Sequence, residues 1–256
     1  MNIVIIGSGN IATHLSKAFQ TAGHTISQIY SRTLANATAL ANVVHTDCVI
    51  DNFDSLDQKA DLYLIAVSDL AIQQVVDRIP KEIQGIIVHT SGATCIEVLE
   101  KFENHGVIYP PQSLNKEIHS DISVIPFGIE ANKDSNFKIL WELIHKIAPK
   151  SFPCNSKQRL ALHVSAVISN NFSNLLFSIS KQILDQQELD FELLKPIILE
   201  TAEKVQHNDP YLTQTGPARR GDHNVINKHL EFLSHLPEEK EIYQILTNII
   251  IKRYHK

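Results

Sequence analysis

The segment from Gly7 to Ala12 carries small residues at the spacing that a nucleotide phosphate requires. It follows a short aliphatic run and opens a helical pattern. In this context GxGxxA is the fingerprint of a dinucleotide-binding turn, in which the glycines permit a tight bend and let the backbone approach a pyrophosphate. The free N–H groups and the dipole of the helix N-terminus then favour the anion. The alternative is that the glycines reflect only a tight turn between strand and helix, without a bound nucleotide. The residues expected to bind the cofactor here are Gly7, Ser8, Gly9, Asn10 and Ile11.

The end of the second expected strand indicates which dinucleotide is bound. An NAD site usually has an acidic residue there, on the ribose hydroxyls. This chain instead has Ser31, Arg32 and Thr33. Arg32 offers a planar, permanently charged fork for a 2′-phosphate, and the two hydroxyls offer further donors. The sequence therefore predicts NADP, with a surface arginine beside a helix cap at Thr33 as the alternative.

Later strand ends should face the same crevice, because parallel strands end at one edge of the sheet. Val67 and Ser68 follow the strand from Leu62, and small residues there would let the cofactor pass. Ser91 and Gly92 follow the next strand. We expect Ser91 and Gly92 to lie near the nicotinamide and the substrate.

Two other strand ends leave alternatives open. His89 is either a catalytic acid or a histidine whose hydrogen bonds are satisfied at a strand end. The segment Tyr109-Pro110-Pro111-Gln112-Ser113 contains two prolines, which make a stiff, extended loop that could form a wall of the pocket.

A polar stripe interrupts an apolar helical pattern in the second half of the chain. His163, Asn170 and Asn174 are spaced i, i+7 and i+11, so they share one face of a regular helix. Polar groups on an otherwise buried helix need hydrogen-bond partners. Those partners are other side chains, water or a substrate, and we expect a substrate.

The segment from Thr215 to Asp222 combines a Gly-Pro chain break with two arginines. Arg219 or Arg220 could hold a substrate carboxylate in a bidentate pair. The alternative is an inter-helix turn capped by Asp222, with both arginines exposed to solvent.

The elements that must position these residues change in type near residue 155. Up to residue 154, short aliphatic runs alternate with helical patterns, which predicts a mainly parallel α/β sheet of the Rossmann type. From residue 155 to 256 the pattern is all-α. The expected strands are 3–6, 25–30, 62–67, 86–89, 107–109 and 127–131; the expected helices are 11–22, 34–41, 70–79, 96–102, 135–147, 157–187, 191–207, 222–236 and 239–254.

Composition excludes several classes of protein. The formal net charge of −5 and the absence of a basic run argue against a nucleic-acid partner. The three cysteines lie far apart and the histidines are scattered, so we expect no metal site. No apolar run approaches the ~20 residues of a membrane helix, and no signal peptide is evident, so we expect a cytoplasmic protein without membrane contacts.

Over essentially its whole length the chain resembles the bacterial Rossmann-like proteins with a C-terminal domain of unknown function 2520. That family lies in the 6-phosphogluconate-dehydrogenase-like superfamily, with pyrroline-5-carboxylate reductases and deazaflavin-dependent NADP reductases as relatives. The resemblance implies an N-terminal NADP domain (1–154), a helical substrate and dimerisation domain (155–256), and a homodimer. It rests on GSGNIA (7–12), YSRT (30–33), HTSGA (89–93), Pro111-Gln112, the helix with His163 and Asn170, and TGPARRGD (215–222).

The chain departs from this pattern at two places. Tyr109 stands before Pro110 where relatives are expected to have histidine, which puts an acid role there in doubt. The β-hydroxyacid dehydrogenase branch uses a Lys–Asn pair one turn apart, whereas Ala166 lies one turn before Asn170. A 3-hydroxyacid substrate is therefore disfavoured, and His163 could supply the proton instead.

These features predict an NADP-dependent oxidoreductase that transfers hydride between the nicotinamide and a C=O or C=N carbon of a small substrate held between the domains, an anionic one if an arginine binds it. His163 is the expected acid or base, Asn170 and Asn174 the expected substrate-orienting residues, and Arg219 or Arg220 the expected anion-binding group. The alternative is a non-catalytic NADP sensor or scaffold, which the missing lysine favours.

Overall fold

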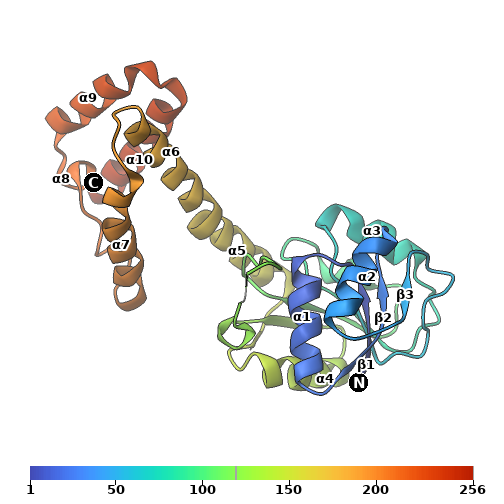
Figure 1. Cartoon of the computed structure of the whole chain (residues 1–256). Helices are drawn as coiled ribbons and strands as arrows, with labels where there is room; N and C mark the ends of the chain where they lie inside the picture. The colour runs from blue at the N-terminus through green and yellow to red at the C-terminus, as the bar shows by residue number, and fades with distance from the viewer. Residues whose placement is uncertain (119, 256) are drawn as a thin grey trace. The chain divides into compact units, whose positions relative to one another are not determined.

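The computed structural model describes residues 1–118 and 120–255. The chain divides into two compact units, Met1–Asn170 and Asn171–Lys256. The first unit contains the β-sheet, and the described residues of the second form helices and the turns between them (Figure 1). The predicted class, an α/β Rossmann domain followed by an all-α domain, is confirmed.

The sheet of the first unit has the order β3-β2-β1-β4-β5-β6-β7-β8. Neighbouring strands are parallel except for β6 and β7, which are antiparallel. The chain order reverses between β1 and β4, which makes their carboxyl ends the topological switch point where such sheets bind ligands. The strands are β1 (Asn2–Ile6), β2 (Thr25–Tyr30), β3 (Val49–Ile50), β4 (Leu62–Ile65), β5 (Ile86–His89), β6 (His105–Tyr109), β7 (Gly128–Ala131) and β8 (Phe152–Pro153).

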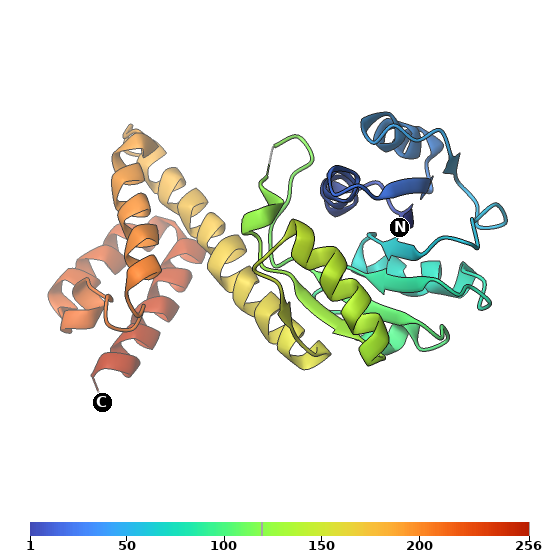
Figure 2. The ribbon, with the colours of Figure 1, turned by 90° about the horizontal axis from the view of Figure 1, so that it is seen from below.

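Helices cover both faces of the sheet because the strands are apolar on both sides. In β1, Ile3 and Ile5 pack into a core with α1 (Asn10–Thr21), α2 (Leu34–Val43) and α4 (Asp134–Ile147). Val4 and Ile6, which point the other way, pack with α3 (Asp69–Arg78). The α4 helix lies along β6 and β7 in Figures 1 and 2.

Several elements of the first unit differ from the expectation, among them the short strand β3, which the sequence pattern did not indicate. Residues 96–102 contain only a short 3-10 turn, η1 (Ile96–Leu99), in place of an α-helix. The sequence pattern gave no indication of β8, because a two-residue edge strand that contains a proline has no readable periodicity. A further 3-10 turn, η2 (Ile122–Val124), precedes β7.

The long helix expected over 157–187 is present but not regular. It consists of α5 (Ser156–Ala166), the π-helical segment η3 (Val167–Phe172) and α6 (Ser173–Asp185). A capping box starts α5, because Asn155 Oδ1 accepts from the Gln158 amide at 2.9 Å and Gln158 Oε1 accepts from the Asn155 amide at 2.9 Å. The domain boundary at 154/155 therefore coincides with a helix start, whereas the two units divide inside η3. The assignment of residues 1–154 and 155–256 as domains stays a prediction.

Short and long helices alternate in the second unit. None of its described helices, nor any described helix of the first unit, is long and apolar enough to cross a membrane. The remaining elements are η4 (Phe191–Leu194), α7 (Lys195–His207), α8 (Pro217–Arg220), α9 (His223–Phe232), η5 (Leu233–His235) and α10 (Pro237–Tyr254).

Candidate functional site

A cavity of about 700 Å³ opens at the carboxyl ends of β1, β2 and β4. All ten residues predicted to bind the cofactor line it, although they come from three separate segments of the chain. The ten are Gly7, Ser8, Gly9, Asn10, Ile11, Ser31, Arg32, Thr33, Val67 and Ser68. Sequence reasoning did not single out several other lining residues, among them Asn36, Phe53, Gln74 and Arg78.

The two glycines of the first turn serve different structural purposes. Gly7 has a φ of +122°, and a Cβ at this position would lie 2.2 Å from the carbonyl oxygen of Ala66. A side chain at Gly7 is therefore excluded both by backbone strain and by lack of space. A Cβ at Gly9 would meet no atom within 4 Å. Gly9 thus leaves open cavity next to the N-terminus of α1, where a phosphate is electrostatically favoured.

The loop after β2 brings cationic and hydroxyl groups to one end of the cavity. Ser8 Oγ donates to Ser31 Oγ at 3.0 Å, which ties the glycine turn to this loop. Arg32 makes no ion pair with a described residue. Arg78 from α3 supplies a second guanidinium, and none of the lining residues is acidic. The cavity is therefore suited to an anionic ligand.

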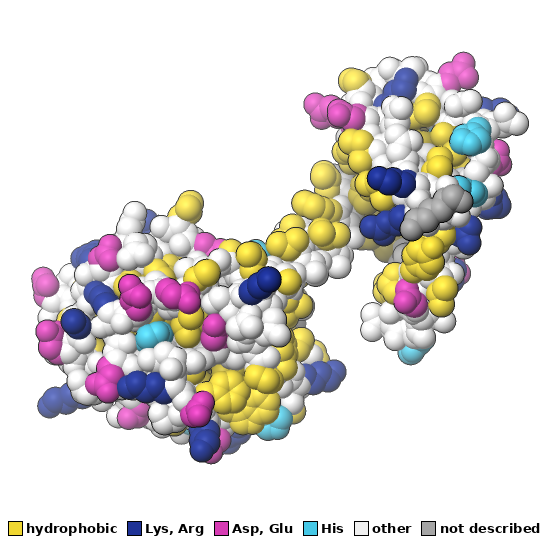
Figure 3. Space-filling view, turned by 180° about the vertical axis from the view of Figure 1, so that it is seen from behind, with side chains coloured by type: hydrophobic (Ala, Val, Ile, Leu, Met, Phe, Trp, Pro, Cys, Tyr) yellow, Lys and Arg dark blue, Asp and Glu magenta, His cyan; other side chains and the backbone are white. Residues whose placement is uncertain are grey.

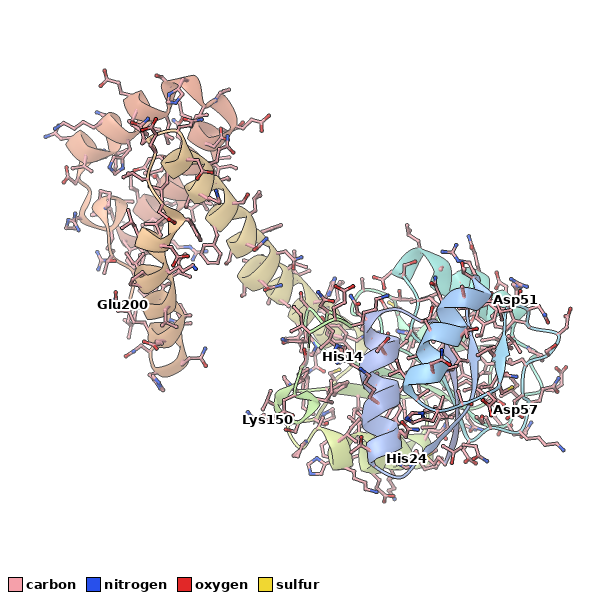
Figure 4. All side chains as sticks on the ribbon, in the orientation of Figure 1. His14, His24, Asp51, Asp57, Lys150 and Glu200 are labelled. Atoms are coloured by element: carbon pink, nitrogen blue, oxygen red, sulfur yellow. The ribbon has the colours of Figure 1, made fainter. Side chains whose placement is uncertain are left out.

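The loop after β6 forms another wall of this cavity, through Gln112, Ser113 and Leu114. Two side chains of α1 hold that loop in place. The His14 Nε2 atom lies 2.9 Å from the Asn115 carbonyl oxygen, and Asn10 Oδ1 accepts from the Lys116 amide at 3.1 Å. His14 is labelled on α1 in Figure 4.

A second polar cluster brings α5 against the ends of β5 and β6. The hydroxyl of Tyr109 lies 3.1 Å from His163 Nδ1, and the two rings meet edge to face with centroids 6.0 Å apart. A Cβ on Gly92 would lie 2.7 Å from the His163 ring, so Gly92 provides the space in which the imidazole sits. Burial raises the pKa of Tyr109, and the charge of Asp69 adds to the rise while Arg159 opposes it. Tyr109 therefore stays a neutral hydroxyl beside His163.

Asn170 contacts the loop after β6. Its Nδ2 donates to Ser113 Oγ at 2.8 Å, and Ser113 is one of the residues that line the large cavity. Asn170 lies within the π-helical segment η3. Such segments are rare and occur frequently at functional sites. The contact places Asn170 beside the wall of this cavity.

Arg159 ties α5 to the loop after β5, and its role is not readable from the sequence. Its side chain is fully buried and pairs with Glu130 of β7. It also donates from Nε to the Ser91 carbonyl at 3.1 Å, and from one terminal nitrogen to the Thr94 carbonyl at 2.6 Å and to Ser156 Oγ at 3.1 Å. His163 follows one turn later, so Arg159 fixes the helix that carries His163 against the loop that carries Ser91.

His89 is held as a neutral buried residue. Its side chain is fully buried, and its Nδ1 accepts from the Ser91 amide at 3.2 Å. Burial, followed by the nearby charge of Arg159, lowers its pKa to about 3. The lowered pKa argues against a proton-donating role for His89, whereas its buried Nε2 has no hydrogen-bond partner among the described residues, so its hydrogen bonds are not fully satisfied either.

Three of the expected substrate residues lie in the second unit. Asn174 belongs to α6, while Arg219 and Arg220 belong to the four-residue helix α8. The guanidinium carbon of Arg219 lies 4.4 Å from the ring centroid of Tyr254 in the same unit. Asp222 Oδ1 caps α9 by accepting from the Val225 amide at 3.2 Å. The substrate roles of Asn174, Arg219 and Arg220 stay predictions.

No group of three or more metal-ligating side chains that could hold an ion occurs among residues 1–118 and 120–255.

Comparison with known proteins agrees with both halves of the fold. A Rossmann-like domain model matches residues 1–113, and the model of the domain of unknown function DUF2520 matches residues 125–250. A search of curated proteins finds no match. The fold is shared with a Thermotoga maritima protein (22% identity, 98% of this chain and 97% of that chain, TM-score 0.75). It is also shared with a 1-pyrroline-5-carboxylate reductase from Streptococcus pyogenes (14% identity, 99% and 98%, TM-score 0.65).

A solved structure from Bacteroides fragilis, described as that of a proposed NADP oxidoreductase, is more similar in sequence. The two chains are 34% identical, the alignment covers 98% of each, and the TM-score is 0.87. An identity of this size over nearly the whole of both chains shows common membership of one family. The chain therefore belongs to the family of Rossmann-like proteins that carry the domain of unknown function DUF2520.

Proposed function

We propose that this protein is an NADP-dependent oxidoreductase that transfers hydride between the nicotinamide and a C=O or C=N carbon of a small substrate. The observation that carries the proposal is the 700 Å³ cavity at the switch point of the sheet, with its open glycine turn. The Bacteroides fragilis relative, described as a proposed NADP oxidoreductase, supports it. The cofactor would supply the hydride, and the protein would supply binding, orientation and a proton.

The choice of NADP over NAD rests on the charges around the cavity. Arg32 and Arg78 line it, whereas no aspartate or glutamate does. A 2′-phosphate 4 Å from a guanidinium near the surface gains about 4 kcal/mol per pair of unit charges at an effective dielectric constant of 20, before desolvation is subtracted. Ser31 and Thr33 would add hydroxyl donors.

His163 is the group that we propose as acid or base. The hydroxyl of Tyr109 contacts its Nδ1, and Gly92 leaves the space in which its ring sits. Because Nδ1 is occupied by Tyr109, Nε2 is the nitrogen that remains for a substrate. Asn170, held by Ser113, would orient the substrate at the cavity wall. Ser91 and Gly92 would contact substrate and nicotinamide, Asn174 would help to orient the substrate, and Arg219 or Arg220 would bind an anionic substrate group.

Replacement of Arg32 tests the cofactor assignment. We expect Arg32→Ala to weaken NADPH binding at least tenfold and to leave NADH binding within a factor of about two, because about half of the ion-pair energy already exceeds 1.4 kcal/mol. The measurement is titration of both cofactors, followed by nicotinamide fluorescence or calorimetry. Arg253→Ala, an exposed arginine of α10, is the matched control. Equal affinity of the wild-type protein for NADPH and NADH would contradict the assignment.

A non-catalytic NADP sensor or scaffold is the second candidate function. Ala166 stands one turn before Asn170, where the β-hydroxyacid dehydrogenases have their catalytic lysine. This favours a protein that binds the nucleotide without turnover. Cofactor binding does not separate the two functions, whereas turnover with imine and carbonyl compounds does.

We also propose a homodimer formed through the helical unit, because that unit buries little of its own apolar surface. Its buried hydrophobic residues, among those described, are Ala218, Ile226, Leu233 and Leu236. The helices α6 and α7 contain no buried residue. Apolar side chains gather on its surface in Figure 3. Exposed apolar side chains of α6, α7 and α10 include Leu175, Phe177, Ile197, Leu199, Ile245 and Ile249. Patches of this kind mark protein–protein interfaces.

A charged substitution in this apolar surface should dissociate the dimer. Leu199, on α7, is 60% exposed, and we expect Leu199→Glu to raise the dimer dissociation constant at least tenfold, because it would place a carboxylate in an apolar interface. Leu70→Glu is the control, since Leu70 is 93% exposed in the first unit. Light scattering after size exclusion measures the oligomeric state. A monomeric wild-type protein at micromolar concentration would refute the proposal.

A further inference from the structure

A second arginine, Arg78, lines the same cavity as Arg32. Arg78 is the last residue of α3. Side chains on a helix lean toward its N-terminus, which for α3 is the end that follows β4 at the carboxyl edge of the sheet. The long side chain of Arg78 is thus directed back toward the cavity.

Aromatic packing holds the Arg78 guanidinium in place. Its central carbon lies 4.9 Å from the ring centroid of Phe53. Phe53 is 5% exposed and packs against Tyr30, with the ring centroids 4.2 Å apart. Both rings line the cavity as well. Stacking through the flat face leaves the N–H groups at the edge of a guanidinium free to donate.

Arg78 has no acidic partner within residues 1–118 and 120–255. Among the described residues, no carboxylate lies within ion-pair distance of Arg78 or Arg32. The neighbouring carboxylate of Asp77 instead accepts a hydrogen bond from Gln73 Nε2 at 2.8 Å. Neither guanidinium group has an ion-pair partner among the described residues, and none of the residues that line the cavity is acidic. The two arginines therefore favour binding of an anion.

We propose that Arg78 is a second binding residue for the 2′-phosphate of NADP and so a determinant of cofactor specificity. This inference rests on the proposed function, because it assumes that the cavity holds the dinucleotide. The pyrophosphate has its own donors at the N-terminus of α1, beside Gly9. The remaining phosphate of NADP is the one on the ribose, for which Arg32 in the loop after β2 is the proposed partner. Arg32 and Arg78 then hold that phosphate from two elements, the loop after β2 and the helix α3.

Fragments of the cofactor test this assignment directly. Adenosine 2′,5′-bisphosphate carries the 2′-phosphate, and adenosine 5′-monophosphate lacks it. We expect Arg78→Ala to weaken binding of the bisphosphate about 10- to 100-fold, the range of one or two lost charge-assisted hydrogen bonds, and to change binding of the monophosphate less than twofold. Arg78→Gln keeps most of the side-chain length without the charge, and it should also weaken binding of the bisphosphate but not of the monophosphate. Arg253→Ala is the control for loss of a surface arginine.

The possible results distinguish a wrong assignment of Arg78 from a wrong assignment of the nucleotide site. Unchanged binding of both fragments in Arg78→Ala would overturn the role of Arg78. Equal loss of both fragments would also overturn it, because Arg78 would then stack on the adenine instead of holding the phosphate. A wild-type protein that binds neither fragment nor NADPH would refute the nucleotide site itself. Weakened binding of the bisphosphate with unchanged binding of the monophosphate, in both Arg78→Ala and Arg32→Ala, supports a shared phosphate site.

Discussion

Arg159→Ala is expected to lower the free energy of unfolding by about 3–5 kcal/mol, the cost of removing one partner of a buried ion pair. The Arg159 side chain is fully buried, and its partner Glu130 has a side chain only 14% exposed. The substitution leaves that carboxylate without its cation and also leaves the carbonyl oxygens of Ser91 and Thr94 without their donor. A loss of this size is a large fraction of the stability of an ordinary domain. Urea unfolding followed by circular dichroism measures it.

An exposed ion pair in the same unit provides the control for Arg159. Lys133 pairs with Glu103 at 3.0 Å, and their side chains are 41% and 68% exposed. Because solvent screens such pairs, Lys133→Ala should cost less than about 1 kcal/mol. Equal losses in the two variants would show that the burial of Arg159 has no energetic consequence. Because Arg159 also positions α5, any Arg159 variant that stays folded should lose turnover while it retains NADPH binding.

His163→Ala is expected to reduce kcat about 10²- to 10⁴-fold, the usual contribution of a positioned acid or base. NADPH affinity should not change, because His163 is not among the residues that line the nucleotide cavity. Tyr109→Phe removes the hydroxyl that lies 3.1 Å from His163 Nδ1 and keeps the ring. We expect Tyr109→Phe to lower kcat by a smaller factor, because the imidazole stays in place beside Gly92. Steady-state kinetics with NADPH and a panel of cyclic imines and carbonyl compounds provide the measurement.

Two results would count against the role of His163. Unchanged turnover in His163→Ala would exclude His163 as acid or base. His145 is an exposed histidine of α4, so His145→Ala is the control that shows the kcat of a neutral substitution. The absence of wild-type turnover with every compound, together with tight NADPH binding, would favour the sensor over the enzyme.

The sequence alone located the nucleotide turn and the strand ends around it. Gly7 to Ala12 are consecutive residues, and the φ of +122° at Gly7 is a local requirement that only glycine meets easily. The alternation of aliphatic runs and helical patterns then implied a parallel sheet, and a parallel sheet places its carboxyl ends along one edge. Arg32 and Ser68 could therefore be assigned to the same cavity as Gly7 without any knowledge of distances.

Tertiary structure decided every contact that depends on side-chain packing between distant segments. Arg159 is buried because β7 and the loop after β5 enclose it. Arg78 lies near Phe53 because the loop after β3 packs against α3. The pairing of Tyr109 with His163 needs the end of β6 and helix α5 side by side. Local turns follow from the steric preferences of neighbouring residues, which the sequence states directly. Contacts between distant segments follow from how whole elements pack, and hydrophobic periodicity specifies which face is buried but not which polar groups meet there.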